Sequence, residues 1–291
     1  MKCTVKQSDR IASYKSCCDY AYQAGGPIPT GDVFSIWCHT HDLSQLLYAI
    51  SQIRYTRYVI VAHASDFGIT QDIIDVIPPN VIKVFSQNVI HRDDRVESIP
   101  IGSIGSTWIG TDEWSVKHQD DGSYCGEYMA IEESGEEKDI QNLALMDFAV
   151  HSNPSERTPI YEHLKNEPWV TTNLCDASYQ QHEQSDFHSM ERYFKGIYNH
   201  KFIISPLGNG VDCGRNWQAI YLGSIAVIPR HVNIEYYEND LPILVYDDIE
   251  SITEEYLHSK WDEINNRKYN LEKATLPYWK ERISNARNVI L

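Results

Sequence analysis

The segment from Lys201 to His231 constrains the fold of this chain more than any other. Its apolar run Phe202–Ile204 is bounded by Ser-Pro and predicts the end of a buried strand. A glycine turn follows at 208–210, and we expect Asp212 to cap a helix that stops at Gly223. The next apolar run, Ile225–Ile228, predicts a second buried strand. Strand, turn, helix and strand in this order predict a parallel βαβ unit whose helix begins at the ligand-binding edge of the sheet.

This helix start has the chemistry of an anion site. Its first N–H groups have no partner within the helix, and Arg215 follows one turn inside, so a diphosphate would be well received there. Gly208 and Gly210 tolerate positive φ and would let a ligand approach the backbone closely. A loop that merely needs glycine is the alternative, and the turn by itself leaves both interpretations open.

The order of residues from Ser205 to Ile228 is more specific: S-P-x-G-N-G-x-D-x-x-R-x-W-x-A-x-x-L-G-x-I-x-V-I. It resembles the donor-binding signature of the exostosin-like glycosyltransferases. The resemblance covers 140–250 well and 55–105 loosely. It implies an α/β chain of GT-B-like fold, with two Rossmann-like domains whose parallel sheets face a central cleft. It also implies an inverting transfer from a nucleotide sugar.

The resemblance assigns a set of donor-binding residues. The pattern N-P-x-E-R at 153–157 recurs in these transferases after a strand, here expected at 142–148, and Asn153 or Ser152 is expected to cap the helix that follows to Leu164. The expected donor-binding residues are Ser152, Asn153, Arg157, Ser205, Gly208, Asn209, Gly210, Asp212, Arg215 and Gln218. A structural salt bridge is the alternative role for Arg157.

Gln218 departs from the family pattern. The family usually has Glu after the Trp, where it can hold the ribose hydroxyls of the nucleotide. An amide offers neutral rather than charge-assisted hydrogen bonds, so we expect a weaker hold on the donor or a changed donor choice.

The first third of the chain alternates strand-like and helix-like segments. The β-branched run Tyr58–Ala62 predicts a central parallel strand, and the loop after it contains His63 and Asp66. Active sites of open α/β sheets lie at this carboxyl edge, so Asp66 is the candidate general base for the acceptor hydroxyl. Asp66 could instead cap a short helix at 69–76. His63 is the alternative base, because its pKa lies nearer neutrality, or it could orient Asp66.

No metal or other cofactor is expected. The sequence has no D-x-D motif that could bind a divalent ion beside the diphosphate, so the helix N-terminus and Arg215 would take over that charge. His39 and His41 with Asp42 are possible metal ligands. They lack a third ligand nearby in the sequence, and a polar loop is the simpler interpretation.

Composition bounds the partners. The 291 residues carry a net charge of −16, which argues against nucleic acid or an anionic membrane surface. The expected partners are a nucleotide-sugar donor and a glycan acceptor. The acidic run 132–137 predicts a linker. We expect an acceptor domain at 1–138 and a donor domain at 139–291, whose last helix, at 271–289, would cross back onto the first domain as GT-B resemblance implies.

The expected location is the cytoplasm. The first ten residues contain no apolar core of a signal peptide, and no run of 18 apolar residues occurs. Seven cysteines without a C-x-x-C pair indicate reduced thiols. Cellular relatives in the family are usually anchored Golgi enzymes, so the sequence predicts a soluble, anchor-less member, consistent with a bacterial or viral source.

The predicted function is transfer of xylose, galactose or glucuronate from a UDP-sugar to a glycan hydroxyl, because the family uses UDP-sugars. Nothing in the residues selects uracil over guanine, so a GDP-fucose-type transferase is the alternative within the class. The alternative outside it is a non-catalytic nucleotide-sugar or glycan-binding protein, which Gln218 would suit.

Overall fold

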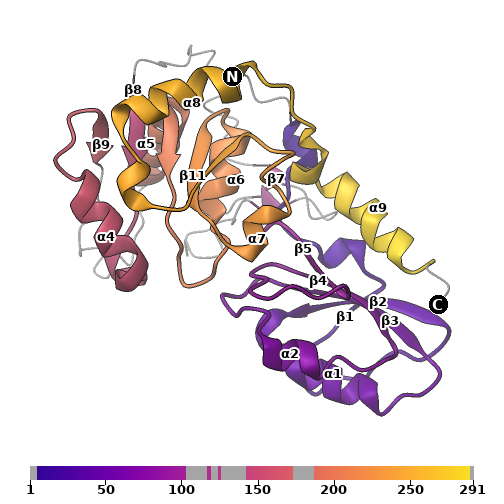
Figure 1. Cartoon of the computed structure of the whole chain (residues 1–291). Coiled ribbons are helices and arrows are strands. Elements are labelled where there is room, and N and C mark those ends of the chain that lie inside the picture. Colours follow the sequence, from indigo (N-terminus) through magenta and orange to yellow (C-terminus); the bar gives the residue numbers. More distant parts are fainter. Residues whose placement is uncertain (1–4, 103–116, 119–123, 126–141, 173–186, 289–291) are drawn as a thin grey trace.

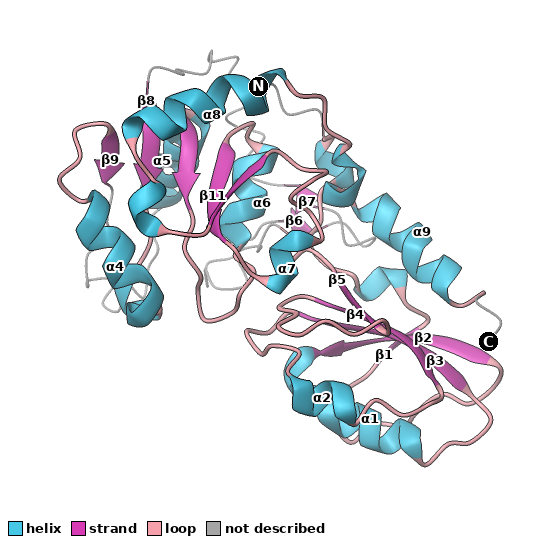
Figure 2. Ribbon diagram, in the orientation of Figure 1, coloured by secondary structure: helices cyan, strands magenta, loops and turns pink. Residues whose placement is uncertain are grey.

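The chain forms two α/β units, each built on a five-stranded sheet in which every neighbouring pair of strands is parallel (Figures 1 and 2). The structure is a computed structural model that describes residues 5–102, 117–118, 124–125, 142–172 and 187–288. The α/β class with two parallel sheets, expected from the sequence, is confirmed. The predicted boundary at 138/139 and the acidic run 132–137 lie outside the described residues.

The first unit has strand order β1-β2-β3-β4-β5. Its central strand β3 is buried along almost its whole length, since helices and the second unit cover it. Helix α1 carries Leu43, Leu46, Leu47 and Ile50 at helical spacing, and those four side chains are buried. The elements are β1 (Tyr20–Ala21), β2 (Val33–His39), α1 (Leu43–Ser51), β3 (Arg57–His63), α2 (Gln71–Asp75), β4 (Val81–Ser86) and β5 (Val96–Ser98), with 3-10 turns at Gln7–Asp9, Lys15–Cys17 and Thr40–Asp42.

The second unit has strand order β12-β11-β10-β8-β9, and a short antiparallel pair, β6 with β7, stands apart from both large sheets. The antiparallel pair is β6 (Lys117–His118) with β7 (Tyr124–Cys125). The elements of the second unit are β8 (Asn142–Met146), α4 (Pro154–Leu164), β9 (Val170–Thr172), α5 (Phe187–Tyr198), β10 (His200–Ile204), α6 (Gly214–Tyr221), β11 (Ile225–Pro229), α7 (Val232–Glu235), β12 (Ile243–Tyr246), α8 (Glu254–Asn266) and α9 (Leu276–Ala286), with 3-10 turns at Val150–Ser152, Ile249–Ser251 and Leu271–Ala274.

The predicted βαβ unit is confirmed as β10, α6 and β11. Gly223 ends the helix with φ of 72°, and the N–H groups of Gly223 and Ser224 donate to the carbonyls of Ile220 and Ala219 at 3.1 and 2.8 Å. These two bonds form a Schellman motif, which explains the need for glycine there. The start differs from the expectation by one residue, because Cys213 rather than Asp212 occupies the N-cap position.

The last helix lies along the first unit (Figure 1). Arg282 of α9 donates to both carboxylate oxygens of Glu97 in β5, at 2.6 and 2.9 Å, and Arg287 pairs with Asp19 at 3.0 Å. The single helix expected over 271–289 is instead a 3-10 turn followed by α9. Pro277 explains the break, because it has no N–H to continue a helix but fits a first turn.

Two further expectations from the sequence concern membrane-spanning helices and the state of the cysteines. Among the residues that the structure describes, no helix is both long enough and apolar enough to cross a bilayer. The cysteines whose side chains are described, Cys17, Cys18, Cys38 and Cys213, are free thiols.

Candidate functional site

The carboxyl edges of the two sheets meet at the candidate site. The loop after β3 carries Asp66, and the loop after β10 carries Asn209. The Asn209 side-chain amide donates to a carboxylate oxygen of Asp66 at 3.3 Å, and both residues are exposed. Two loops separated by 143 residues in the sequence are thus in direct contact, each at the end of its central strands.

The loop after β10 is held in place from the start of α4. The Asn153 amide donates to the Gly208 carbonyl at 2.7 Å, and the Arg157 Nε donates to the Leu207 carbonyl at 2.8 Å. Asn153 occupies the N-cap position of α4, as expected, with Pro154 in the first turn, but its side chain makes no cap bond. It positions the neighbouring loop instead.

Ser152 ends the 3-10 turn that precedes α4 and is half-buried. Its backbone N–H donates to the Ala149 carbonyl at 3.3 Å, which shapes the approach to the helix.

Arg157 and Arg215 form a pair of guanidinium groups beside this loop. Both pack against the ring of Phe148, with Cζ 5.6 and 5.8 Å from its centroid. Arg157 is buried and also donates to the Ala149 carbonyl at 2.7 Å. Burial, together with the nearby charge of Arg215, lowers the pKa of Arg157. Two like charges held this closely favour an anion between or beside them.

Arg215 keeps hydrogen-bonding capacity for a ligand. Its Nε is buried and has no hydrogen-bond partner among the described residues. The rest of the guanidinium has neighbours, and Nη1 lies 3.6 Å from the Cys213 sulfur. Although burial acts in the opposite direction, interactions with Cys213, Tyr193 and Asp147 raise the pKa of this arginine. A buried N–H without an acceptor is costly, so an incoming oxygen would be well received. The α6 N-terminus lies at the same place, and no side-chain cap bond from its N-cap residue, Cys213, occupies it.

Gln218 contacts this pair through Tyr193. The Tyr193 hydroxyl donates to the Gln218 side-chain oxygen at 2.7 Å, and Gln218 is buried on α6. Burial raises the pKa of Tyr193, so its hydroxyl stays a donor at neutral pH. Sequence reasoning missed both Tyr193 and Phe148, because neither lies in the glycine-turn motif.

We expect Gln218→Glu to fold and to bind UDP as well as the wild type or up to about tenfold more tightly. The carboxylate would still accept the Tyr193 hydroxyl bond, and it restores a charge-assisted acceptor at this position. Thermal unfolding and titration with UDP measure the two effects, with Tyr193→Phe as the control that removes the hydroxyl alone. Loss of folding in Gln218→Glu would assign the residue to the core.

Three of the predicted donor-binding residues, Ser205, Gly208 and Gly210, are in contact with other side chains of the protein. The buried Ser205 hydroxyl donates to the Asn216 side-chain oxygen at 2.7 Å. The glycines at 208 and 210 do not have positive φ. A Cβ at Gly210 would lie 2.5 Å from the amide nitrogen of Asn88, and one at Gly208 would lie 3.1 Å from the Arg157 guanidinium. Glycine at 210 is therefore favoured by close packing rather than by an unusual backbone angle, and a side chain at 208 would press on the Arg157 guanidinium.

Asp212 joins the two units. Its buried carboxylate accepts the Ile101 N–H of the first unit at 2.7 Å and, on its own side, the Trp217 indole N–H at 3.0 Å. Its own N–H donates to the Asn88 side-chain oxygen at 2.8 Å. Burial raises the pKa of Asp212 to about 6, and the surrounding N–H donors act in the opposite direction. The contacts make this residue part of the seam between the units.

His63 and Asp66 lie in different environments. The His63 ring is 3% exposed, meets the Tyr14 ring edge-on at 4.8 Å, and has its Nε2 3.2 Å from the Pro100 carbonyl. Burial lowers its pKa to about 4, so it is neutral at pH 7. Asp66 is exposed and faces Asn209. The geometry favours Asp66 over His63 as the group that meets a substrate.

We expect the free energy of unfolding to fall as pH drops from about 6.5 toward 4. In the unfolded chain His63 is protonated near pH 6.5, whereas in the folded chain its pKa of about 4 delays protonation to lower pH. The loss should reach about 2–3 kcal/mol near pH 4.5. Urea unfolding of the wild type and of His63→Gln at several pH values measures it. The raised pKa of Asp212 has the opposite effect, since it stabilises the folded chain as pH falls. The contribution of His63 is therefore the difference in unfolding free energy between wild type and His63→Gln at each pH. If the unfolding free energies of the two proteins changed equally with pH, the assignment to His63 would be wrong.

The loop after β3 is rigidly held. Ala64 and Asn88 have φ of 57° and 58°, a conformation rarely adopted by residues other than glycine, and no other non-glycine residue in the described ranges shares it. The Gln87 side chain accepts the Ala64 N–H at 3.0 Å and donates to the Ser65 carbonyl, as does Asn88 at 3.1 Å. Backbone strain maintained by surrounding bonds is frequent at functional sites. Gln87 and Asn88 therefore hold this loop in place, a role that the sequence alone did not indicate.

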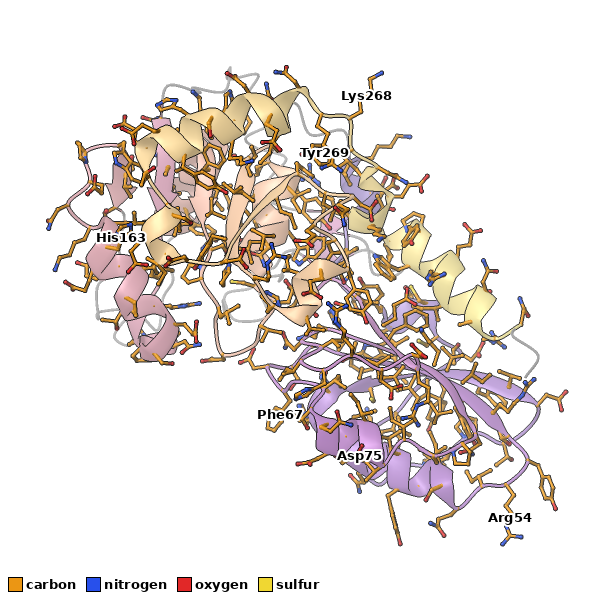
Figure 3. The ribbon with its side chains drawn as sticks, viewed as in Figure 1. Arg54, Phe67, Asp75, His163, Lys268 and Tyr269 are labelled. Atoms are coloured by element: carbon orange, nitrogen blue, oxygen red, sulfur yellow. The ribbon has the colours of Figure 1, made fainter. Side chains whose placement is uncertain are left out.

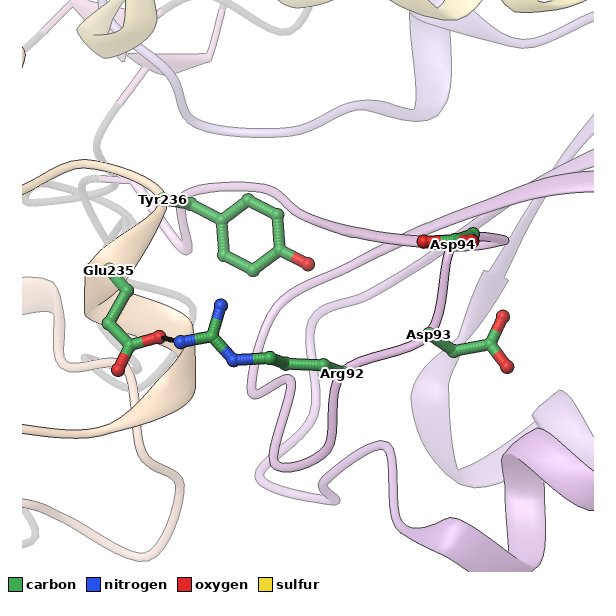
Figure 4. Close-up of a pocket in the computed structure, with 5 residues that line it drawn as sticks. All are labelled: Arg92, Asp93, Asp94, Glu235 and Tyr236. Atoms are coloured by element: carbon green, nitrogen blue, oxygen red, sulfur yellow. Dashed lines mark hydrogen bonds and ion pairs between the residues drawn. The ribbon is translucent and has the colours of Figure 1, made fainter.

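A cavity lies where the β4–β5 loop meets α7. It measures about 240 Å³ and is lined by Arg92, Asp93, Asp94, Glu235 and Tyr236, and the Arg92–Glu235 ion pair joins the two units there (Figure 4). Within the described ranges no cluster of three or more His, Cys, Asp or Glu side chains is arranged to hold a metal ion. His39 and His41, weighed above as ligands, are stacked ring on ring at 5.0 Å.

Comparison with known proteins gives only distant likenesses. No protein-family model matches the chain, so membership of the exostosin-like family is not confirmed, and no curated protein sequence matches it either. Structurally similar chains include a spinosyn rhamnosyltransferase, SpnG, complexed with spinosyn aglycone (TM-score 0.39, 9% identity, 87% of this chain and 70% of that one).

Another is a GtfA/B complex, with a TM-score of 0.41 and 8% identity over 88% of this chain and 57% of that one. A third is the pneumococcal O-GlcNAc transferase GtfA in complex with UDP and GlcNAc, with a TM-score of 0.37 and 10% identity over 87% of this chain and 56% of that one. This chain thus spans little more than half the length of the latter two. None of the three is similar enough to support a conclusion about function.

Proposed function

We propose that the protein is an inverting glycosyltransferase that moves a sugar from a nucleotide-sugar donor to a glycan hydroxyl. The observation that supports this most is the contact between Asp66 and Asn209. It brings a carboxylate of one unit to the loop that borders the Arg157–Arg215 pair of the other. A transferase of this kind needs a base and an anion site on opposite walls, and these residues have the right chemistry for both.

The anion site would bind the donor diphosphate. Arg215 and the N-terminus of α6 would stabilise the negative charge that grows on the diphosphate as the glycosidic bond breaks. Arg157, already bound to the loop carbonyls, would act mainly by holding that loop and by adding positive charge. Ser205, Gly210 and Asp212 would support the loop from behind rather than touch the donor, whereas Ser152, Asn153, Gly208, Asn209 and Gln218 remain candidates for direct contact.

Asp66 would act as the general base. The acceptor oxygen would attack the anomeric carbon from the face opposite the diphosphate, its proton would pass to Asp66, and the electron pair of the broken bond would leave with the diphosphate. A single in-line displacement of this kind inverts the anomeric configuration. We further propose that the reaction needs no divalent metal, since the arginine pair and the helix terminus already supply positive charge.

The donor is proposed to be a UDP-sugar carrying xylose, galactose or glucuronate, by resemblance of the 205–228 segment to the exostosin-like signature. A GDP-fucose-type donor is the competing choice. A thermal-shift screen of UDP, GDP and their sugars, with and without EDTA, distinguishes them. A shift with one nucleotide family that survives EDTA supports the proposal.

The sugar nucleotide that raises the unfolding temperature in this screen is then used as the donor. Its hydrolysis and the transfer of its sugar are measured with and without methyl glycosides as acceptors. Slow release of free sugar and inverted product support a transferase. Donor binding without any turnover would identify a non-catalytic nucleotide-sugar-binding protein. Activity that disappears in EDTA and returns with Mn²⁺ would refute the metal-free mechanism.

A further inference from the structure

Four aromatic rings form a continuous row along the carboxyl edge of the first sheet. The Trp37 and His39 rings meet edge-on at 4.7 Å, His39 stacks on His41 at 5.0 Å with 8° between the planes, and His41 meets Phe67 at 6.3 Å. The row starts in the core, where Trp37 is buried, and ends at the surface. We call these four residues the aromatic row.

Phe67 is the exposed end of the row. Its side chain is 66% exposed, although it is one of the larger apolar side chains, and it directly follows Asp66 (Figure 3). An exposed aromatic ring beside polar groups is typical of a ligand-binding surface.

The backbone that carries Phe67 is fixed. The Ser65 hydroxyl contacts both the Phe67 N–H and the His41 Nδ1 at 3.4 Å, and the Ser65 carbonyl is held by Gln87 and Asn88. His39 Nδ1 lies 3.3 Å from the Ala64 carbonyl. Because the loop is already ordered, a ligand that stacks on Phe67 would not lose binding energy to ordering it.

We propose that Phe67 and His41 form an acceptor subsite that binds a pyranose ring of the glycan. The C–H face of the sugar would lie on the Phe67 ring, and the half-exposed His41 imidazole would hydrogen-bond a sugar hydroxyl. We choose this occupant because Phe67 directly follows Asp66, so a pyranose ring on Phe67 would lie beside the proposed base. The role of this subsite as an acceptor site rests on the proposed function. Binding of a sugar to it can be measured without any transfer.

Saturation-transfer NMR with methyl β-glucopyranoside and methyl β-galactopyranoside tests this directly. We expect at least one of them to receive saturation on its ring C–H protons from wild-type protein. Phe67→Ala should weaken its binding about three- to tenfold, and Phe67→Trp should retain it. Tyr55→Ala is the matched control, because Tyr55 is 92% exposed and precedes β3, at the opposite end from Phe67, next to the Arg54 labelled in Figure 3.

Equal binding by wild type and Phe67→Ala would overturn the inference, as would the absence of saturation transfer to both sugars. Tighter binding of p-nitrophenol than of either pyranoside at Phe67 would also contradict it, by indicating a flat aromatic ligand. Thermal unfolding of each variant verifies folding. If UDP fails to bind while pyranosides bind through Phe67, the proposed transferase function fails and the sugar subsite stands.

Discussion

Asp66→Asn should lower sugar transfer by about 10²- to 10⁴-fold while leaving donor affinity close to that of the wild type. The amide has the shape of the carboxylate but cannot accept the acceptor proton. It can still meet Asn209 through its side-chain oxygen, so the contact between the two loops survives. Transfer rates with saturating donor and titration with UDP give the two quantities.

The matched control is Asp32→Asn. Asp32 is also exposed on the first unit but directly precedes β2, at the edge of the sheet away from Asp66. Transfer should be normal in this variant. Normal transfer in Asp66→Asn, or a loss that merely follows a lower unfolding temperature, would remove Asp66 from the mechanism and leave the buried His63 to be tested.

Arg215→Ala should cost roughly 2–4 kcal/mol of transition-state stabilisation, as expected for the loss of one preorganised donor to the departing charge. UDP affinity should fall as well, since the unpartnered buried Nε would otherwise bind a phosphate oxygen. Arg215→Lys should recover only part of the loss, because lysine keeps the charge but not the planar set of donors. Steady-state kinetics and UDP titration measure both effects.

Arg267→Ala is the control for Arg215, because Arg267 is an exposed arginine of the same unit at the end of α8. Removing one member of a like-charged pair should not unfold the protein, and relief of repulsion with Arg157 offsets part of the lost packing on Phe148. Unchanged kcat/KM and UDP affinity in a folded Arg215→Ala would refute the anion site.

Patterns of apolar residues predicted the fold well. The strands predicted at 58–62, 202–204 and 225–228 all occur, because continuous apolar runs are decided locally. Short edge elements such as β1 and β9 were missed. Two or three residues carry too little pattern to be recognised, and their pairing partner alone decides them.

The candidate site was predicted less completely. The motif located the loop at 208–210 and Arg215, but it could not tell residues that face a ligand from those that face the other unit. Asp212 and Gly210 look like ligand contacts in sequence, yet Ile101 and Asn88 occupy their positions in space. Those neighbours lie more than a hundred residues away, and only the docking of the two sheets brings them together.

The ion pairs between α9 and the first unit have a consequence for synthesis of the chain. The ion pair between Glu97 and Arg282 can form only after the ribosome has added the 185 residues that separate them. At roughly 5–20 residues per second, that interval lasts about 10–40 s on the ribosome. During this time β5 lacks the helix that covers it, and a nascent chain would be most open to chaperones there. Helix α9 therefore completes a unit that is synthesised long before it, so nascent chains arrested before α9 should be cleaved by protease in the first unit more readily than released protein.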